Sequence, residues 1–248
     1  MNAPLASSLR DTSEADRWSQ RFPRIAGGLY LSVIIGGLFA EGVVQGSLIV
    51  PGDAAATVQA IAESTQLWRW GIGIHLLYLV CAALPMYVLL YRLWSRAWPA
   101  LALLALAFAL TSAAVEAAAL LTLYVPLAMV ETASGLAGLA EEQRHALAYF
   151  AITLYSKGFG FALLFFAGFC AATGILVLRS RMLPRLIGAM MILAGVCYFV
   201  SSLATVVTPA LAAVLYPWIL FPCLAGEGAF ALWLLLKGVD VRAGPDLH

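Results

Sequence analysis

Long runs of apolar residues dominate the chain, and short segments that are polar or contain proline and glycine separate them. A helix needs about 20 apolar residues to cross a bilayer core roughly 30 Å thick. Six runs are long enough, at about 25–50, 67–94, 100–130, 146–178, 185–208 and 214–236. We therefore predict an all-α integral membrane protein with a six-helix transmembrane bundle.

The segments between these runs predict shorter elements. Val50-Pro51-Gly52-Asp53 is a turn signal, and residues 54–65 are predicted to form a short amphipathic helix on the outer surface. Residues 1–20 are polar and lack the apolar core of a cleaved signal peptide. The expected organisation is a cytoplasmic tail at 1–23, a transmembrane domain at 24–239 and a second cytoplasmic tail at 240–248.

Composition supports the membrane assignment and excludes some classes of protein. Hydrophobic residues make up 63% of the 248 residues and charged residues only 11%, far from the balance of a soluble domain. The formal net charge of +1 provides no basic surplus, and the arginines sit at helix ends. We expect the lipid bilayer as the main partner, no nucleic-acid binding and no separate soluble domain.

The basic residues predict the orientation of the bundle. Lysine and arginine near helix ends are retained on the cytoplasmic side of a membrane. Most of the basic residues fall on one side of the predicted bundle: Arg10, Arg17, Arg21, Arg24, Arg92, Arg96, Arg179, Arg181, Arg185, Lys237 and Arg242. Both termini are therefore expected in the cytoplasm.

Five charged or histidine residues lie away from the ends of the predicted spans, one in each helix except the fifth. They are Glu41, His75, Glu116, Lys157 and Glu227. A charged group at the centre of a membrane helix costs roughly 2.5 to 3.5 kcal/mol on insertion scales, and such groups usually face the protein interior and mark functional paths. Counted from the outer ends of the helices, all five are expected roughly 12 to 20 Å deep.

Polar neighbours at helical spacing strengthen this prediction. Gln45 follows Glu41 by four residues and Tyr78 follows His75 by three, so each pair shares a helix face. Such faces line cavities more readily than they meet lipid. We expect one polar pocket in the outer half of the bundle, built from the five ionisable residues with Gln45 and Tyr78.

Three interpretations of this pocket remain open at the level of sequence. It could bind a small molecule, a lipid headgroup or an ion for transport or sensing, with Glu41 and Glu227 exchanging protons. It could be an intramembrane enzyme that binds zinc or iron, with ligands drawn from Glu41, His75, Glu116 and Glu227. The charges could instead brace a structural or partner-binding protein, for example through an ion pair of Lys157 with a glutamate.

Several segments resemble a bacterial family of multi-pass membrane proteins known as domain of unknown function 4386. The residues that carry the resemblance are Arg24-Ile25-Ala26-Gly27-Gly28-Leu29-Tyr30-Leu31, Gly37-Leu38-Phe39-Ala40-Glu41, Val50-Pro51-Gly52-Asp53-Ala54, Leu183-Pro184-Arg185-Leu186-Ile187-Gly188, Gly226-Glu227 and Leu232-Trp233-Leu234-Leu235-Leu236-Lys237-Gly238. The resemblance implies residence in the bacterial cytoplasmic membrane and a six-helix bundle, with Glu41 and Glu227 at motif positions. It implies no activity, cofactor or oligomeric state.

Overall fold

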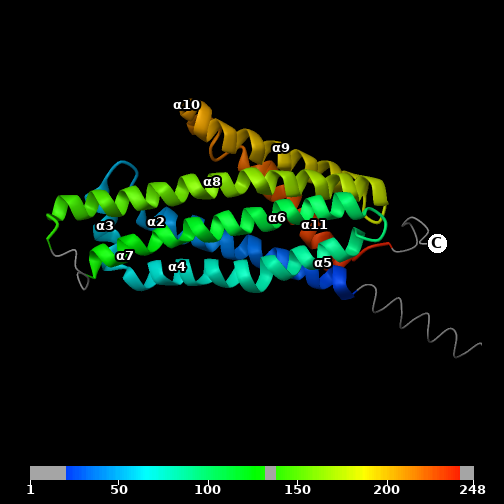
Figure 1. Cartoon of the computed structure of the whole chain (residues 1–248), viewed down its shortest axis with the longest axis horizontal. Coiled ribbons are helices and arrows are strands. Elements are labelled where there is room, and N and C mark those ends of the chain that lie inside the picture. The colour runs from blue at the N-terminus through cyan, green and yellow to red at the C-terminus, as the bar shows by residue number, and fades with distance from the viewer. Residues whose placement is uncertain (1–20, 132–137, 241–248) are drawn as a thin grey trace, which may run out of the picture.

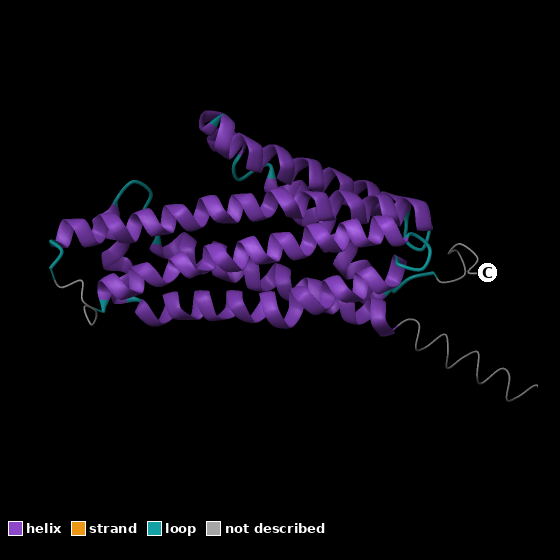
Figure 2. Ribbon diagram, viewed as in Figure 1, coloured by secondary structure: helices purple, strands orange, loops and turns teal. Residues whose placement is uncertain are grey.

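The computed structural model describes residues 21–131 and 138–240, which form helices joined by short turns and contain no strand within those ranges. The helices lie roughly along one axis and form an elongated bundle (Figures 1 and 2). Most of each predicted tail, 1–23 and 240–248, lies outside the described residues. The all-α prediction is confirmed for the part of the chain that the structure describes.

Five helices are long and apolar enough to cross a membrane. They are Arg21–Leu48, Thr65–Trp94, Pro99–Val130, Glu141–Ser180 (α8) and Arg185–Val207 (α9). A sixth apolar segment is a pair of helices, Pro209–Leu215 (α10) and Leu220–Leu236 (α11), which are bent by 57° at their break. The described residues thus contain five membrane-type helices, or six if the bent pair is one span, and they indicate a multi-pass membrane protein.

The first three of these helices change their winding along their length. The first contains the π-helix η1 (Leu38–Gln45) and ends in α2 (Gly46–Leu48). The second consists of α4 (Thr65–Tyr78), the π-helix η2 (Leu79–Ala83) and α5 (Leu84–Trp94). The third consists of α6 (Pro99–Leu120), the 3-10 turn η3 (Leu121–Leu123) and α7 (Tyr124–Val130). π-Helical turns occur frequently at functional sites. Glu41 lies within η1, and Tyr78 directly precedes η2.

The predicted surface helix is present as α3, which spans Ala54–Glu63 and ends two residues before the predicted boundary. The Asp53 side chain accepts a 2.9 Å hydrogen bond from the backbone N–H of Ala56 and so caps the helix. Its buried residues, Thr57, Val58 and Ile61, turn toward the bundle. The helix covers one end of the bundle near α7 and α8 (Figure 1).

Most of the basic residues at helix ends gather at the other end of the bundle, which we call the basic end: Arg21, Arg24, Arg92, Arg96, Arg179, Arg181, Arg185 and Lys237. With a rise of 1.5 Å per residue, the 40 residues of α8 extend about 60 Å, whereas the 23 residues of α9 extend about 35 Å. The helix α9 therefore ends well before the far end of α8, and α10 stands apart from the bundle there (Figure 1).

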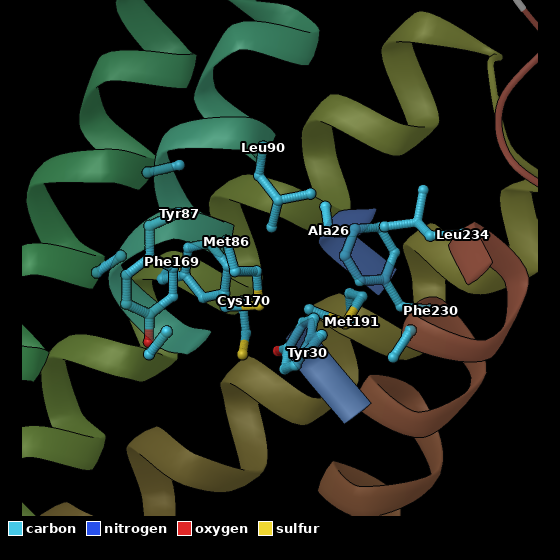
Figure 3. Packing of buried hydrophobic residues seen from close by; sticks show 14 of the residues in the cluster. Ala26, Tyr30, Met86, Tyr87, Leu90, Phe169, Cys170, Met191, Phe230 and Leu234 are labelled. Carbon is cyan, nitrogen blue, oxygen red and sulfur yellow. The ribbon is translucent and has the colours of Figure 1, made fainter. Parts of the chain in front are cut away.

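The hydrophobic core near the basic end is built from side chains of the five membrane-type helices and α11. Figure 3 shows Tyr30, Met86, Phe169 and Phe230 pointing toward a shared centre, and each is at most 2% exposed. Small residues let the helices approach closely around this core. A Cβ atom built on Gly27 would lie 2.5 Å from the backbone nitrogen of Leu235, so the first helix and α11 are in direct backbone contact.

Candidate functional site

Three of the predicted residues, Glu41, His75 and Glu116, meet inside the bundle although they come from three different helices. The His75 ring is only 1% exposed and lies between the two carboxylates. Its Nε2 is 2.7 Å from Oε1 of Glu116, and its Nδ1 is 3.7 Å from Oε1 of Glu41. The imidazole therefore lies between two carboxylates, with Glu116 at hydrogen-bonding distance and Glu41 farther away.

The Nε2 side of His75 is closed by Tyr78, one turn later on the same helix. The Tyr78 hydroxyl is 2.7 Å from Nε2 and donates a 2.9 Å hydrogen bond to Oε1 of Glu116. The two rings also stack, with centroids 4.7 Å apart. Because Nε2 faces an acidic oxygen at short range, we assign the ring proton of a neutral His75 to Nε2.

The Nδ1 side of His75 is formed by Glu41, Gln45 and Tyr155. Oε1 of Glu41 accepts hydrogen bonds from the Tyr155 hydroxyl and, at 2.7 Å, from Nε2 of Gln45. The Tyr155 hydroxyl is also 3.5 Å from Nδ1 of His75. The spacing of Gln45 behind Glu41 thus predicts a real contact, and α8 adds a hydroxyl that links Glu41 to the imidazole.

Tyr155 belongs to this cluster, although the sequence analysis did not include it in the predicted pocket. It is 1% exposed and contacts the cluster from α8. The sequence analysis selected charged and histidine residues within the spans, and a tyrosine does not meet that criterion because its hydroxyl carries no charge at neutral pH. The available signal is its position two residues before Lys157, on the opposite side of the same helix.

The Glu41 side of the cluster is more exposed than the Glu116 side. The Glu41 side chain is 32% exposed, compared with 14% for Glu116 and 1% for His75. A cavity of about 10 Å³ adjoins this side and is lined by Val44, Gln45, Trp68 and His75 among others. Such a volume holds about one water molecule.

The three residues lie at one depth. Glu41 is 17 residues after Arg24, His75 is 17 residues before Arg92, and Glu116 is 17 residues after Pro99. At 1.5 Å per residue, each is about 26 Å from the basic end. The cluster therefore lies close to the far edge of a bilayer core roughly 30 Å thick, if that core begins at the basic end.

Glu227 forms a second and separate polar centre. Its carboxylate accepts hydrogen bonds from Tyr198 at 2.6 Å and from Tyr30 at 3.1 Å, and the residue is 6% exposed. Glu227 is 10 residues before Lys237, about 15 Å from the basic end. Tyr30 precedes Glu41 by 11 residues, about 16 Å along the first helix, so Glu227 does not share the space of the outer cluster.

Comparison with known proteins agrees with the motifs in the sequence. The family described as Domain of unknown function (DUF4386) matches residues 25–238, which is most of the chain. The chain belongs to this family. No curated protein and no solved structure matches it.

In this DUF4386 protein, Lys157 does not join either polar centre. Its side chain is exposed on α8 and, in residues 21–131 and 138–240, makes no ion pair or hydrogen bond. The neighbouring Thr153 hydroxyl bonds to the Tyr149 carbonyl of its own helix. The sequence predicts one space shared by five ionisable residues; the structure instead has a cluster of three, a separate Glu227 and an outward-facing Lys157.

The ligand set expected for a metal-dependent enzyme is not gathered in this DUF4386 protein. Among the described residues, no group of three or more His, Cys, Asp and Glu side chains is arranged to hold a metal ion. Glu41 and Glu116 approach opposite nitrogens of His75, and a metal bound to one nitrogen would face only one of them. Glu227, the fourth expected ligand, lies in the other centre.

Proposed function

We propose that this DUF4386 protein is a six-span protein of the bacterial cytoplasmic membrane that binds a small ligand at the Glu116–His75–Glu41 cluster and exchanges protons there. Both termini are cytoplasmic in this proposal, and the site opens toward the outer surface. The ligand donates hydrogen bonds, because the cluster presents two carboxylates and an imidazole nitrogen. Transport or sensing of that ligand would use the same site.

The observation that carries the proposal is the asymmetry around His75. Nε2 is held by Glu116 and Tyr78 at hydrogen-bonding distance, whereas the 3.7 Å between Nδ1 and Glu41 is too long for a hydrogen bond. A proton can be added at Nδ1, which then bears a positive charge between two carboxylates. This loosely held side is also the exposed one, so a proton or ligand has access to it.

Proton exchange at Nδ1 can be tested by NMR of ring-nitrogen-labelled histidine in nanodiscs. We expect the Nδ1 signal of His75 to change reversibly with bulk pH, while Nε2 stays in its protonated form because Glu116 and Tyr78 hold it. The variant His75→Gln assigns the signals, and Glu41→Gln is expected to alter the response of Nδ1 alone. If the ring-nitrogen signals of His75 do not change over the pH range in which the protein stays folded, proton exchange at this site is refuted.

The proposed topology is supported by the basic end and by the aromatic residues near the α10–α11 break. Tyr216 and Trp218 are exposed at that break, where amphipathic rings favour a membrane interface. We expect alkaline phosphatase to be active when fused after Glu131 and inactive when fused after the last residue. Fluorescent protein fusions should show the reverse pattern, and equal activity at both positions would contradict the topology.

A bracing role is the second candidate, because the cluster ties four helices together. Glu41, His75, Glu116 and Tyr155 each come from a different helix and are joined by side-chain contacts. A brace requires hydrogen bonds but no change of protonation. The histidine NMR experiment therefore separates the two candidates, since only a site that exchanges protons responds to bulk pH.

A further inference from the structure

The first helix and α11 are in close contact near the basic end and separate toward the cluster. At the level of Gly27, a built Cβ would lie 2.6 Å from the carbonyl oxygen of Ala231. One turn further, Tyr30 donates a hydrogen bond to Glu227 of α11. Glu41 follows Tyr30 by 11 residues, which is about three helical turns, so it lies on a similar side of the first helix.

The helix α11 is too short to cover Glu41. It begins at Leu220, seven residues before Glu227, and so extends about 10 Å beyond Glu227 toward the cluster. Glu41 lies about 16 Å beyond Tyr30, the partner of Glu227, which leaves about 6 Å uncovered. Beyond Leu220 the chain turns away into α10, which is bent by 57° from α11 and has no buried residue.

Exposure of the facing side chains agrees with this separation. Leu38 lies 11 residues after Gly27, and Leu224 lies seven residues before Ala231, so each continues the face by which its helix meets the other. Yet Leu38 is 54% exposed and Leu224 is 41% exposed. Leu38 and Leu224 are therefore not covered by the opposite helix, and we infer an apolar crevice between them, with the partly exposed carboxylate of Glu41 one turn beyond Leu38.

The charge at this end of the crevice selects a cation. The cluster contains two carboxylates, and no lysine or arginine contacts either of them among the described residues. Glu41 receives both of its hydrogen bonds at Oε1, so Oε2 remains open to another donor in the described part of the chain. An ammonium group supplies a positive charge and several N–H donors.

We propose that the crevice between the first helix and α11 binds an amphipathic primary ammonium, with its apolar chain along Leu38 and Leu224 and its ammonium on Glu41. This inference rests on the proposed function, because it names the ligand class of the same cluster. The position near the far edge of the bilayer core, where headgroups begin, favours an amine-bearing lipid as the occupant. A single-chain alkylamine of the same chemistry is the alternative outcome of the test.

Lipid retention measured by native mass spectrometry tests the proposal. The protein is reconstituted in equal amounts of phosphatidylethanolamine, phosphatidylglycerol and phosphatidylcholine, then released into detergent. We expect phosphatidylethanolamine to be retained over the other two lipids, and Glu41→Gln to reduce that preference about tenfold, as the loss of a charge-assisted hydrogen bond implies. Leu38→Trp should reduce it as well by filling the crevice.

Two controls make the outcome specific. Glu63→Gln changes an exposed glutamate on α3 and should leave the preference unchanged. Dodecylamine added to the same sample should displace phosphatidylethanolamine from the wild type but should not change the lipid retained by Glu41→Gln. If the wild type binds dodecylamine but shows no preference among the lipids, the site is assigned to free amines.

Equal retention of all three lipids together with no dodecylamine binding, or a preference that survives Glu41→Gln, would overturn the ammonium proposal. The proposed function is judged separately, because the response of His75 Nδ1 to pH is measured without any amine. Thermal unfolding of each variant shows whether a lost preference reflects a lost fold.

Discussion

Replacing Glu116 with leucine is expected to lower the free energy of unfolding by about 3 kcal/mol, the loss typical of removing one partner from a buried polar pair. Glu116 accepts from the Tyr78 hydroxyl and contacts Nε2 of His75 at 2.7 Å. Leucine would remove the acceptor that the Tyr78 hydroxyl and the His75 Nε2–H share, at a site where His75 is only 1% exposed. Equilibrium unfolding in mixed detergent micelles measures the change.

Glu116→Gln is the matched control because its amide keeps a carbonyl oxygen that can accept a hydrogen bond. We expect a loss of about 1 kcal/mol, the value of one ordinary hydrogen bond. Glu63→Gln, on the surface of α3, should have no measurable effect. If Glu116→Leu is as stable as the wild type, the contacts of His75 and Tyr78 with Glu116 contribute nothing to the stability of the fold.

Gly27→Ala is expected to destabilise the protein by about 2 kcal/mol, within the range for overpacking a tight contact. The added methyl carbon would lie 2.5 Å from the Leu235 nitrogen and 2.6 Å from the Ala231 oxygen. Both are backbone atoms, so neither can rotate aside as the end of a flexible side chain could. The first helix and α11 must separate, which would also strain the Tyr30–Glu227 hydrogen bond.

Gly37→Ala provides the comparison, since it makes the same substitution on the same helix at a position with open space. Nothing lies within 4 Å of a Cβ built on Gly37. Alanine is there expected to be neutral or stabilising by up to about 1 kcal/mol, because it favours the helix over the unfolded chain. Equal losses for Gly27→Ala and Gly37→Ala in thermal unfolding would show that the two helices do not touch as described.

The helices were predictable from sequence because their signal is local. An apolar run of sufficient length and a turn signal define a span without knowledge of its neighbours, and α3 was predicted in the same way from Asp53 and an amphipathic pattern. The common depth of Glu41, His75 and Glu116 was also predictable, since each is a costly residue at a comparable distance from a helix end.

The roles of Lys157, Glu227 and Tyr155 could not be predicted in the same way. Depth along a helix says nothing about rotation around its axis, so Lys157 could face outward while Tyr155 faces the cluster. Glu227 was grouped with the others because its depth was counted from the outer end of its own helix. That helix, α11, begins at Leu220, only about 26 Å from the basic end, so its outer end lies nearer the basic end than those of Pro99–Val130 and α8.

By itself the sequence determined that this chain is a set of membrane-type helices with acidic and histidine residues inside, because hydrophobicity and helical rise act residue by residue. Only the tertiary structure decided which of those residues meet, since that depends on how each helix is rotated and where its neighbours end. The short α11 leaves Glu41 partly exposed, and Tyr155 completes the cluster from α8, 114 positions after Glu41 in the sequence. Both features result from packing between helices, which no local pattern encodes.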